Sequence, residues 1–214
     1  MRLLVVKNLY VLIGGKTLLE DLNFELRASE RLVVIGPNGA SKTVLTKALL
    51  DLFAYSGEIS WAPNVRIGYV PQKIDADRHL PITYRDLFVS KCRIIKAPAK
   101  GIDQIAETVG LTKEMSETPV GHLSGGQFQR GLIGFALIGK PNVLLLDEPT
   151  ASIDEPGEEH IYELIHRLQD QYDLAVIAVT HDLSSWKPAH RYTKCTWARR
   201  EQSYNFLLRN GSRG

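Results

Sequence analysis

The segment at residues 36–43 has the residue types of a phosphate-binding loop. It follows an apolar run at residues 32–35 and precedes apolar residues at helical spacing. Backbone N–H groups in such a loop, together with the first turn of the following helix, form a concave site for anions. We expect Lys42 to reach the terminal phosphates of a nucleotide and the Thr43 hydroxyl to bind Mg²⁺. The residues expected to cradle the phosphates are Gly36, Pro37, Asn38, Gly39, Ala40, Ser41, Lys42, Thr43 and Val44.

This segment departs from the strict pattern G-x-x-x-x-G-K-[ST], because Ser41 stands where the second fixed glycine is required. Taken alone, it leaves a nucleotide site and a tight strand–helix turn as equal alternatives. If the backbone at Ser41 needs a positive φ, a serine there costs on the order of 1–2 kcal/mol. Such a cost weakens nucleotide binding roughly tenfold. We therefore expect Ser41→Gly to strengthen ATP affinity.

Two carboxylates follow a second apolar run, at residues 143–146. An aspartate that ends a buried strand is the usual second holder of Mg²⁺ in a phosphate-loop site, and Asp147 is expected to play this role. The neighbouring Glu148 is expected to orient and deprotonate an attacking water. The alternative is a helix N-cap region, where such residues are common. The phosphate-loop pattern upstream favours the metal site.

A third segment places a serine and two glycines at the start of an expected helix. Its residues are Ser124, Gly125, Gly126 and Gln127. A helix start of this kind is a second site for anions. For an isolated serine and glycine pair, a simple capped helix start is the better interpretation. Here the segment shares one chain with the phosphate loop and the carboxylates.

The elements that must position these residues alternate between strands and helices. The runs at residues 32–35, 143–146 and 174–180 predict strands buried on both faces of a sheet. Helical spacing of apolar residues predicts helices over 43–53 and 158–172. This alternation predicts an α/β fold with a largely parallel sheet.

The first 30 residues predict a different local structure. Short apolar segments at residues 3–6, 10–13 and 22–26 alternate with polar turns, and the Gly14–Gly15 pair predicts a tight turn. This pattern is typical of antiparallel hairpins. Residues 82–118 are more polar and mostly helical in pattern.

The composition is that of an ordinary globular protein. In 214 residues, 44% are hydrophobic and 23% are charged, which excludes disorder as the main state. The two cysteines, Cys92 and Cys195, lie far apart, which excludes a disulfide scaffold and a zinc ribbon. No apolar run reaches the ~18 residues of a membrane span, and the first residues do not resemble a signal peptide. We expect a cytoplasmic location.

The charge is unevenly distributed along the chain. The net charge is only +2, yet residues 184–214 contain seven basic residues and one acidic residue. This tail lacks a sustained apolar period, so we expect a solvated terminus of uncertain structure. A patch for nucleic acid or a membrane surface is one alternative. A disruption of the coding frame near Ser184 is another.

Together, the three segments and the residues VTHD at 179–182 resemble the ATP-binding cassette (ABC) family over residues 3–183. The resemblance implies a P-loop NTPase (RecA-like) core with a mainly parallel sheet and an N-terminal antiparallel β subdomain. It also implies a helical subdomain inserted at about residues 73–142. The expected division is one ABC ATPase domain, residues 1–183, followed by a basic C-terminal tail, residues 184–214.

The resemblance implies roles for individual residues. Tyr10 matches the aromatic residue that stacks on adenine, although a strand aromatic in a small core is the alternative. Asp154 matches the aspartate that follows the carboxylate segment in the family, and it belongs to the implied nucleotide site. The implied catalytic residues are Glu148, His181, Gln72 and Lys42, and the implied Mg²⁺ ligands are Thr43, Gln72 and Asp147.

In this family two cassettes pair head to tail, with ATP and Mg²⁺ between them. The resemblance therefore implies a homodimer in which Ser124, Gly125 and Gly126 of one chain face the phosphate held by Lys42 of the other. One cassette per chain and a short helical insertion imply a transporter subunit. Its partner is then an integral-membrane permease, and its place is the cytoplasmic face of the cell membrane.

Residues 66–73, with the segments 80–83 and 85–88, resemble zinc and manganese uptake cassettes. This implies import of zinc, or else manganese or iron, delivered indirectly by an extracytoplasmic metal-binding protein. No nucleic-acid partner is expected. Two alternatives remain, a soluble ABC ATPase not tied to a permease and a nucleotide-binding or regulatory subunit weakened by Ser41.

Overall fold

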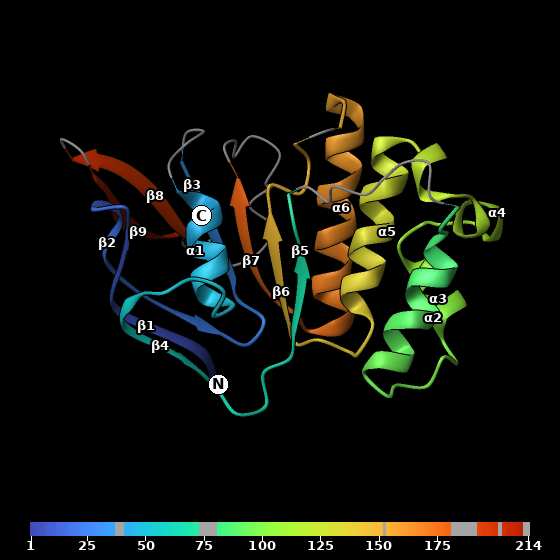
Figure 1. Cartoon of the computed structure of the whole chain (residues 1–214), viewed down its shortest axis with the longest axis horizontal. Coiled ribbons are helices and arrows are strands. Elements are labelled where there is room, and N and C mark those ends of the chain that lie inside the picture. The colour runs from blue at the N-terminus through green and yellow to red at the C-terminus, as the bar shows by residue number, and fades with distance from the viewer. Residues whose placement is uncertain (37–40, 73–80, 152, 181–191, 201–202, 212–214) are drawn as a thin grey trace.

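A computed structural model describes residues 1–36, 41–72, 81–151, 153–180, 192–200 and 203–211. Within these residues, β3, β5, β6, β7, β8 and β9 form a six-stranded sheet with the order β5-β6-β7-β3-β8-β9 (Figure 1). Neighbouring strands are parallel except for β8 and β9. The bounds are β3 Arg31–Ile35, β5 Ile67–Val70, β6 Val143–Asp147, β7 Ala175–Thr180, β8 Tyr192–Arg200 and β9 Ser203–Gly211.

The described residues also contain an antiparallel sheet of the order β2-β1-β4. Its strands are β1 Arg2–Ile13, β2 Lys16–Arg27 and β4 Ser56–Trp61. Gly14 and Gly15 form the predicted turn with φ values of 57° and 76°, which glycine adopts without strain. The expectation of a polar turn between the apolar segments at residues 3–6 and 10–13 is wrong. One strand runs through both because the register shifts between Val6 and Leu9, around Asn8 at φ 47°, absorb the polar interruption.

Helices cover both faces of the parallel sheet. Helix α1, Lys42–Leu49, packs on one face, and α5, Gly125–Leu137, and α6, Glu155–Tyr172, pack on the other (Figure 1). Alternate residues of β3 belong to different cores, because Val33 packs with α5 and α6 whereas Leu32 and Val34 pack with α1. The α/β fold class with a mainly parallel sheet is confirmed.

Helix α1 is shorter than the predicted helix over residues 43–53. Its C-cap is Leu50, and Asp51 then takes a φ of 58°, which ends the helix. Leu52, which the predicted helix over residues 43–53 includes as one of its apolar residues, is 65% exposed. The helical spacing of apolar residues continues to Leu52 in the sequence, but the backbone leaves the helix at Asp51.

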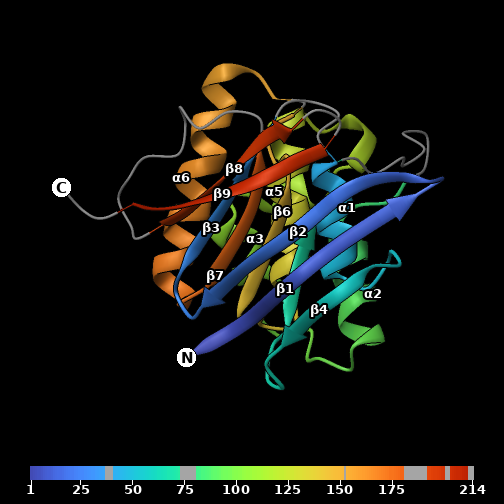
Figure 2. The same cartoon turned by 90° about the vertical axis from the view of Figure 1, so that its left-hand side faces the viewer.

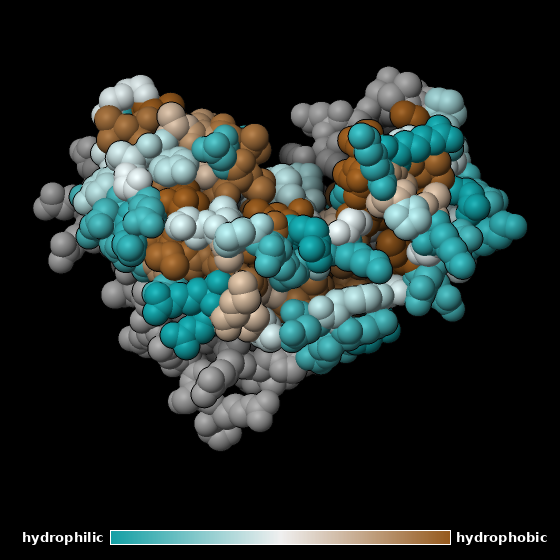
Figure 3. Space-filling view, turned by 90° about the horizontal axis from the view of Figure 1, so that it is seen from below, coloured by the Kyte–Doolittle hydropathy of each residue, from teal (hydrophilic) through white to brown (hydrophobic). Residues whose placement is uncertain are grey.

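The inserted helical part lies between β5 and β6. It contains α2 Tyr84–Ile94, α3 Ile102–Thr108, α4 Lys113–Glu117 and a 3₁₀ turn at Val120–His122 before α5. Figure 3, seen from below, shows a surface hollowed between this part and the part that carries the antiparallel sheet. No helix among the described residues combines the length and the apolar composition needed to cross a membrane.

Two glycines inside α5 let α2 approach closely. A Cβ at Gly131 would lie 2.0 Å from the ring of Tyr84, and one at Gly134 would lie 2.8 Å from the ring of Phe88. Tyr84 and Phe88 are fully buried. Each glycine weakens a helix by about 1 kcal/mol relative to alanine, and in α5 it makes room for an aromatic ring.

The backbone of the basic tail differs from a solvated terminus. β8 pairs with β3 in parallel, from Arg31 opposite Tyr192 to Ile35 opposite Thr196, and β9 pairs with β8. β9 also contacts β2 of the antiparallel sheet (Figure 2). Backbone pairing of this kind needs no apolar period, since the hydrogen bonds to β3 are independent of side-chain type. The division of the chain at residue 183 stays a prediction.

Candidate functional site

The phosphate-loop segment ends in a left-handed residue at the start of α1. Ser41 is the N-cap of α1 with φ 59° and ψ 23°. Ser41 therefore takes the positive φ on which the expected strain depends. Val44 N–H donates to Ser41 O over 3.0 Å, and the Val44 side chain packs against the core beneath α1. Pro37, Asn38, Gly39 and Ala40 lie outside the described residues.

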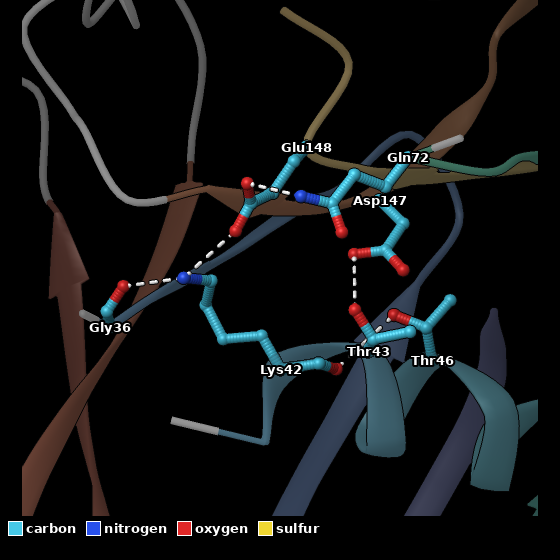
Figure 4. Close-up of polar contacts among 7 residues, drawn as sticks. All are labelled: Gly36, Lys42, Thr43, Thr46, Gln72, Asp147 and Glu148. Carbon is cyan, nitrogen blue, oxygen red and sulfur yellow. Dashed lines mark hydrogen bonds and ion pairs between the residues drawn. The ribbon is translucent and has the colours of Figure 1, made fainter. Parts of the chain in front are cut away.

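Lys42 lies at the centre of a polar cluster at the carboxyl ends of β3 and β6. Its Nζ donates to the backbone oxygen of Gly36 over 2.7 Å and forms an ion pair with Glu148 Oε1 at 2.9 Å (Figure 4). The Lys42 side chain is only 4% exposed. Solvent therefore screens its charge little, and these two oxygens help to hold the ammonium group in place.

Glu148 is held from both its backbone and its side chain. Its N–H donates to Val179 O over 2.8 Å, and its backbone takes a φ of 45°. Gln72, two residues beyond β5, donates from Nε2 to Glu148 Oε2 over 2.9 Å (Figure 4). The structure thus brings two of the predicted catalytic residues, Lys42 and Gln72, into direct contact with a third, Glu148.

Asp147 and Thr43 supply adjacent oxygens beside this cluster. Thr43 Oγ1 donates to Asp147 Oδ1 over 3.4 Å. Asp147 is fully buried, and its Oδ2 has no hydrogen-bond partner among the described residues. Burial raises the pKa of the Asp147 carboxyl, and the hydrogen bond from Thr43 opposes this shift. A buried carboxylate oxygen next to a hydroxyl fits a hard divalent cation such as Mg²⁺.

Tyr69 is a neighbour of this site that sequence reasoning missed. It lies on β5, opposite Leu145 of β6. Burial raises the pKa of its phenol to about 12, and the charge of Asp147 adds to the shift. The sequence does place Tyr69 three residues before Gln72, on a strand that ends at the site, and this position could have identified it.

The segment at Ser124 forms the start of α5 as a capping box. Gln127 N–H donates to Ser124 Oγ over 3.3 Å, and Ser124 N–H donates to Gln127 Oε1 over 2.9 Å. Ser124, Gly125 and Gly126 line a groove of about 870 Å³ together with Asp154, the N-cap of α6. None of the described residues lining this groove belongs to the Lys42 cluster.

The remaining predicted residues lie apart from these contacts or outside the described residues. Tyr10 lies on β1 opposite Ser56 of β4 and is half-buried, so both the stacking role and the core role stay open. His181 lies outside the described residues, directly after β7. β7 ends beside the phosphate loop, since Gly36 N–H donates to Thr180 O over 3.3 Å.

The family model described as ABC transporter matches residues 19–151. The chain belongs to the ABC transporter family. It is 41% identical over 182 residues to the zinc import ATP-binding protein ZnuC of Haemophilus influenzae, covering 85% of this chain and 66% of the relative. It is 38% identical to the ZnuC of Brucella abortus strain 2308, covering 85% of this chain and 60% of the relative. This ABC chain therefore spans about two thirds or less of the length of these relatives.

Solved structures agree with this ABC family fold. One chain belongs to an ABC transporter described as metal-chelate type, in an inward-facing conformation, with a TM-score of 0.79 and 21% identity. That match covers 99% of this chain and 98% of the other. A dimeric bacterial ABC transporter cassette matches with a TM-score of 0.74 and 22% identity, over 90% of this chain and 94% of the other. These neighbours confirm the expected P-loop ATPase fold.

Proposed function

We propose that this chain is the ATP-binding subunit of an ABC transporter and hydrolyses ATP with Mg²⁺ in a head-to-tail homodimer. The observation that carries this proposal is the convergence of five side chains beyond the carboxyl ends of β3, β5 and β6. They are Lys42, Thr43, Gln72, Asp147 and Glu148. In an open α/β sheet, ligands bind beyond the carboxyl ends of the strands.

Each side chain has a defined task in this reaction. Lys42 binds the terminal phosphates and stabilises charge on the transferred phosphoryl group. Glu148 accepts a proton from the water as the water oxygen bonds to the γ-phosphorus and the bond to the ADP oxygen breaks. Thr43 and Asp147 hold Mg²⁺, which when bound neutralises charge on the phosphates. His181 contacts the γ-phosphate, and Tyr10 stacks on the adenine.

The second chain completes the site. Its Ser124, Gly125 and Gly126 face the phosphates held by Lys42, with Asp154 beside them. The common groove of Ser124 and Asp154, apart from the Lys42 cluster of the same chain, supports a role across an interface. ATP contacts both chains only in the closed dimer, so it stabilises closure, and hydrolysis favours reopening.

The proposed transport reaction is import of zinc or another divalent metal. The support is the printed function of the relatives, which are zinc import ATP-binding proteins. The proposed partners are an integral-membrane permease at the cytoplasmic face of the membrane and, indirectly, an extracytoplasmic metal-binding protein. Growth of a deletion strain under zinc limitation tests the metal. Rescue by manganese or iron but not by zinc would replace zinc as the proposed metal, and a growth defect that no divalent metal relieves would contradict import of a divalent metal.

ATP turnover by wild type and Glu148→Gln tests the enzymatic role. We expect the variant to lose at least about 100-fold in turnover, since a positioned base contributes about 10²–10⁴. Glu107→Gln removes an exposed carboxylate on α3 and serves as the charge-matched control with unchanged turnover. Equal turnover in wild type and Glu148→Gln would mean that this carboxylate is not the base. The second candidate, a weakened nucleotide-binding subunit, is favoured by the strained backbone of Ser41.

A further inference from the structure

Lys42, Glu148 and Gln72 form a continuous chain of polar contacts that uses both oxygens of one carboxylate (Figure 4). Lys42 Nζ lies 2.9 Å from Glu148 Oε1, and Gln72 Nε2 lies 2.9 Å from Glu148 Oε2. The Lys42 and Glu148 side chains are 4% and 10% exposed. Their charges therefore act on one another through a medium less polarisable than water, and the pair is stronger than a surface ion pair.

The ammonium group in this pair is the group proposed to bind phosphate. An ammonium has three N–H donors, and Lys42 directs one to Gly36 O over 2.7 Å. A phosphate oxygen that reaches Lys42 arrives beside the Glu148 carboxylate, which lies 2.9 Å from the same nitrogen. Two anions this close in buried surroundings repel one another. Phosphate and Glu148 are therefore competitors for Lys42.

The backbone of Glu148 is anchored to β7, so the group that competes with phosphate for Lys42 is its side chain. Its N–H donates to Val179 O on β7, and its backbone takes a φ of 45°. With the backbone anchored at this N–H, the carboxylate leaves Lys42 by rotation of its side-chain bonds. Gln72 opposes that rotation, because its amide donates to the second carboxylate oxygen.

We propose that the Lys42–Glu148 ion pair, held by Gln72, is an autoinhibitory latch that nucleotide phosphates open. While the latch is closed, Glu148 engages the ammonium, and its carboxylate faces Lys42 and Gln72 rather than an attacking water. When phosphate replaces the carboxylate on Lys42, Glu148 is released to accept a proton. The latch thus links the arrival of nucleotide to the readiness of the base. This inference rests on the proposed nucleotide site and assigns Gln72 a positioning role in it.

Stopped-flow binding of a fluorescent ADP to the full chain tests the latch. Magnesium is removed with EDTA, so that the Mg²⁺ roles proposed for Thr43 and Asp147, and the one implied for Gln72, do not affect the result. A latch that is open about one tenth of the time lowers apparent affinity about tenfold. We therefore expect Glu148→Gln to raise the association rate constant about tenfold and Gln72→Leu about threefold. Dissociation rates change little, and the control Glu107→Gln matches wild type.

Three results would overturn the latch. The first is a gain in Glu148→Gln that lies wholly in slower dissociation, because the carboxylate then only repels bound ADP. The second is an unchanged association rate in Gln72→Leu, which also serves as the test if Glu148→Gln does not fold. The third is a wild type that binds no ADP, which removes the nucleotide site itself and so separates failure of the proposed function from failure of the latch.

Discussion

The two glycine-containing segments expected to face phosphate are stabilised in opposite ways. At the first segment, the buried charge of Lys42 is held by Gly36 and by Glu148, which comes from the end of β6. At the second segment, the polar groups of Ser124 and Gln127 satisfy one another within the first turn of α5. The first arrangement depends on partners from other elements, and the second is locally complete.

This difference suits the Lys42 segment to exchange ligands and the Ser124 segment to keep a constant shape. Groups held by exchangeable ionic partners can pass from one ligand to another, which the proposed ATP hydrolysis requires of the Lys42 cluster. A segment capped by its own side chains presents a constant surface, and its position depends on how α5 packs. Variants of α5 should therefore change stability, whereas variants of the Lys42 cluster should change binding and turnover.

The largest expected effect in α5 comes from Gly131→Ala. The new Cβ would lie 2.0 Å from the ring of the fully buried Tyr84, whose hydroxyl donates to Phe128 O over 2.6 Å. The ring cannot move without breaking that bond, so we expect a loss of about 3 kcal/mol in the free energy of unfolding. This corresponds to a Tm about 6–12 °C lower, measured by thermal denaturation.

Gly126→Ala is the matched control in the same helix. A Cβ at Gly126 meets nothing within 4 Å. Alanine is the better helix former, so we expect a gain of up to about 1 kcal/mol. Equal midpoints for the Gly126 and Gly131 variants would contradict the close approach of α2 to α5.

Much of the site could be predicted because its residues follow strands that are apolar throughout. The runs at residues 32–35 and 143–146 indicate strands buried on both faces, and parallel strands present their carboxyl ends at one edge. That argument places Lys42, Asp147 and Glu148 together. The argument does not predict the ion pair between Lys42 and Glu148. Lys42 is expected to bind phosphate and Glu148 to orient water, and no pattern in the sequence specifies which charged groups are in contact.

The elements that could not be predicted are those set by tertiary contacts. Residues 184–214 lack a sustained apolar period, yet the backbone of β8 pairs with β3. The sequence shows that Gly131 lowers the stability of a helix. It does not show why glycine is needed there, because the ring of Tyr84 that takes up the space lies 47 positions away along the chain. Local propensity is overridden in both places by a partner distant in sequence.

A smaller effect is expected for Ser124→Ala. Loss of the hydroxyl that accepts from Gln127 N–H removes an N-cap, which costs about 1 kcal/mol, or about 2–4 °C in Tm. ADP affinity, measured by titration, should stay at the wild-type value because the Lys42 cluster is untouched. Ser124→Asp keeps a capping oxygen and should restore the Tm. An ADP affinity that changes with the cap would contradict the separation of the two segments.

The smallest effect is expected for Ser41→Gly. The structure changes the expected effect from a gain in nucleotide affinity to a gain in stability. The folded chain already holds Ser41 at φ 59°. The strain therefore lowers the free energy of unfolding and adds no cost to nucleotide binding. Relief of about 1–2 kcal/mol, reduced by about 0.4–1 kcal/mol for the freer unfolded glycine, leaves a net gain of about 0.5–1 kcal/mol in unfolding free energy. Ser41→Ala keeps the Cβ and should show no gain. A tenfold gain in ADP affinity at unchanged Tm would instead show that Ser41 reaches its left-handed conformation only when nucleotide binds.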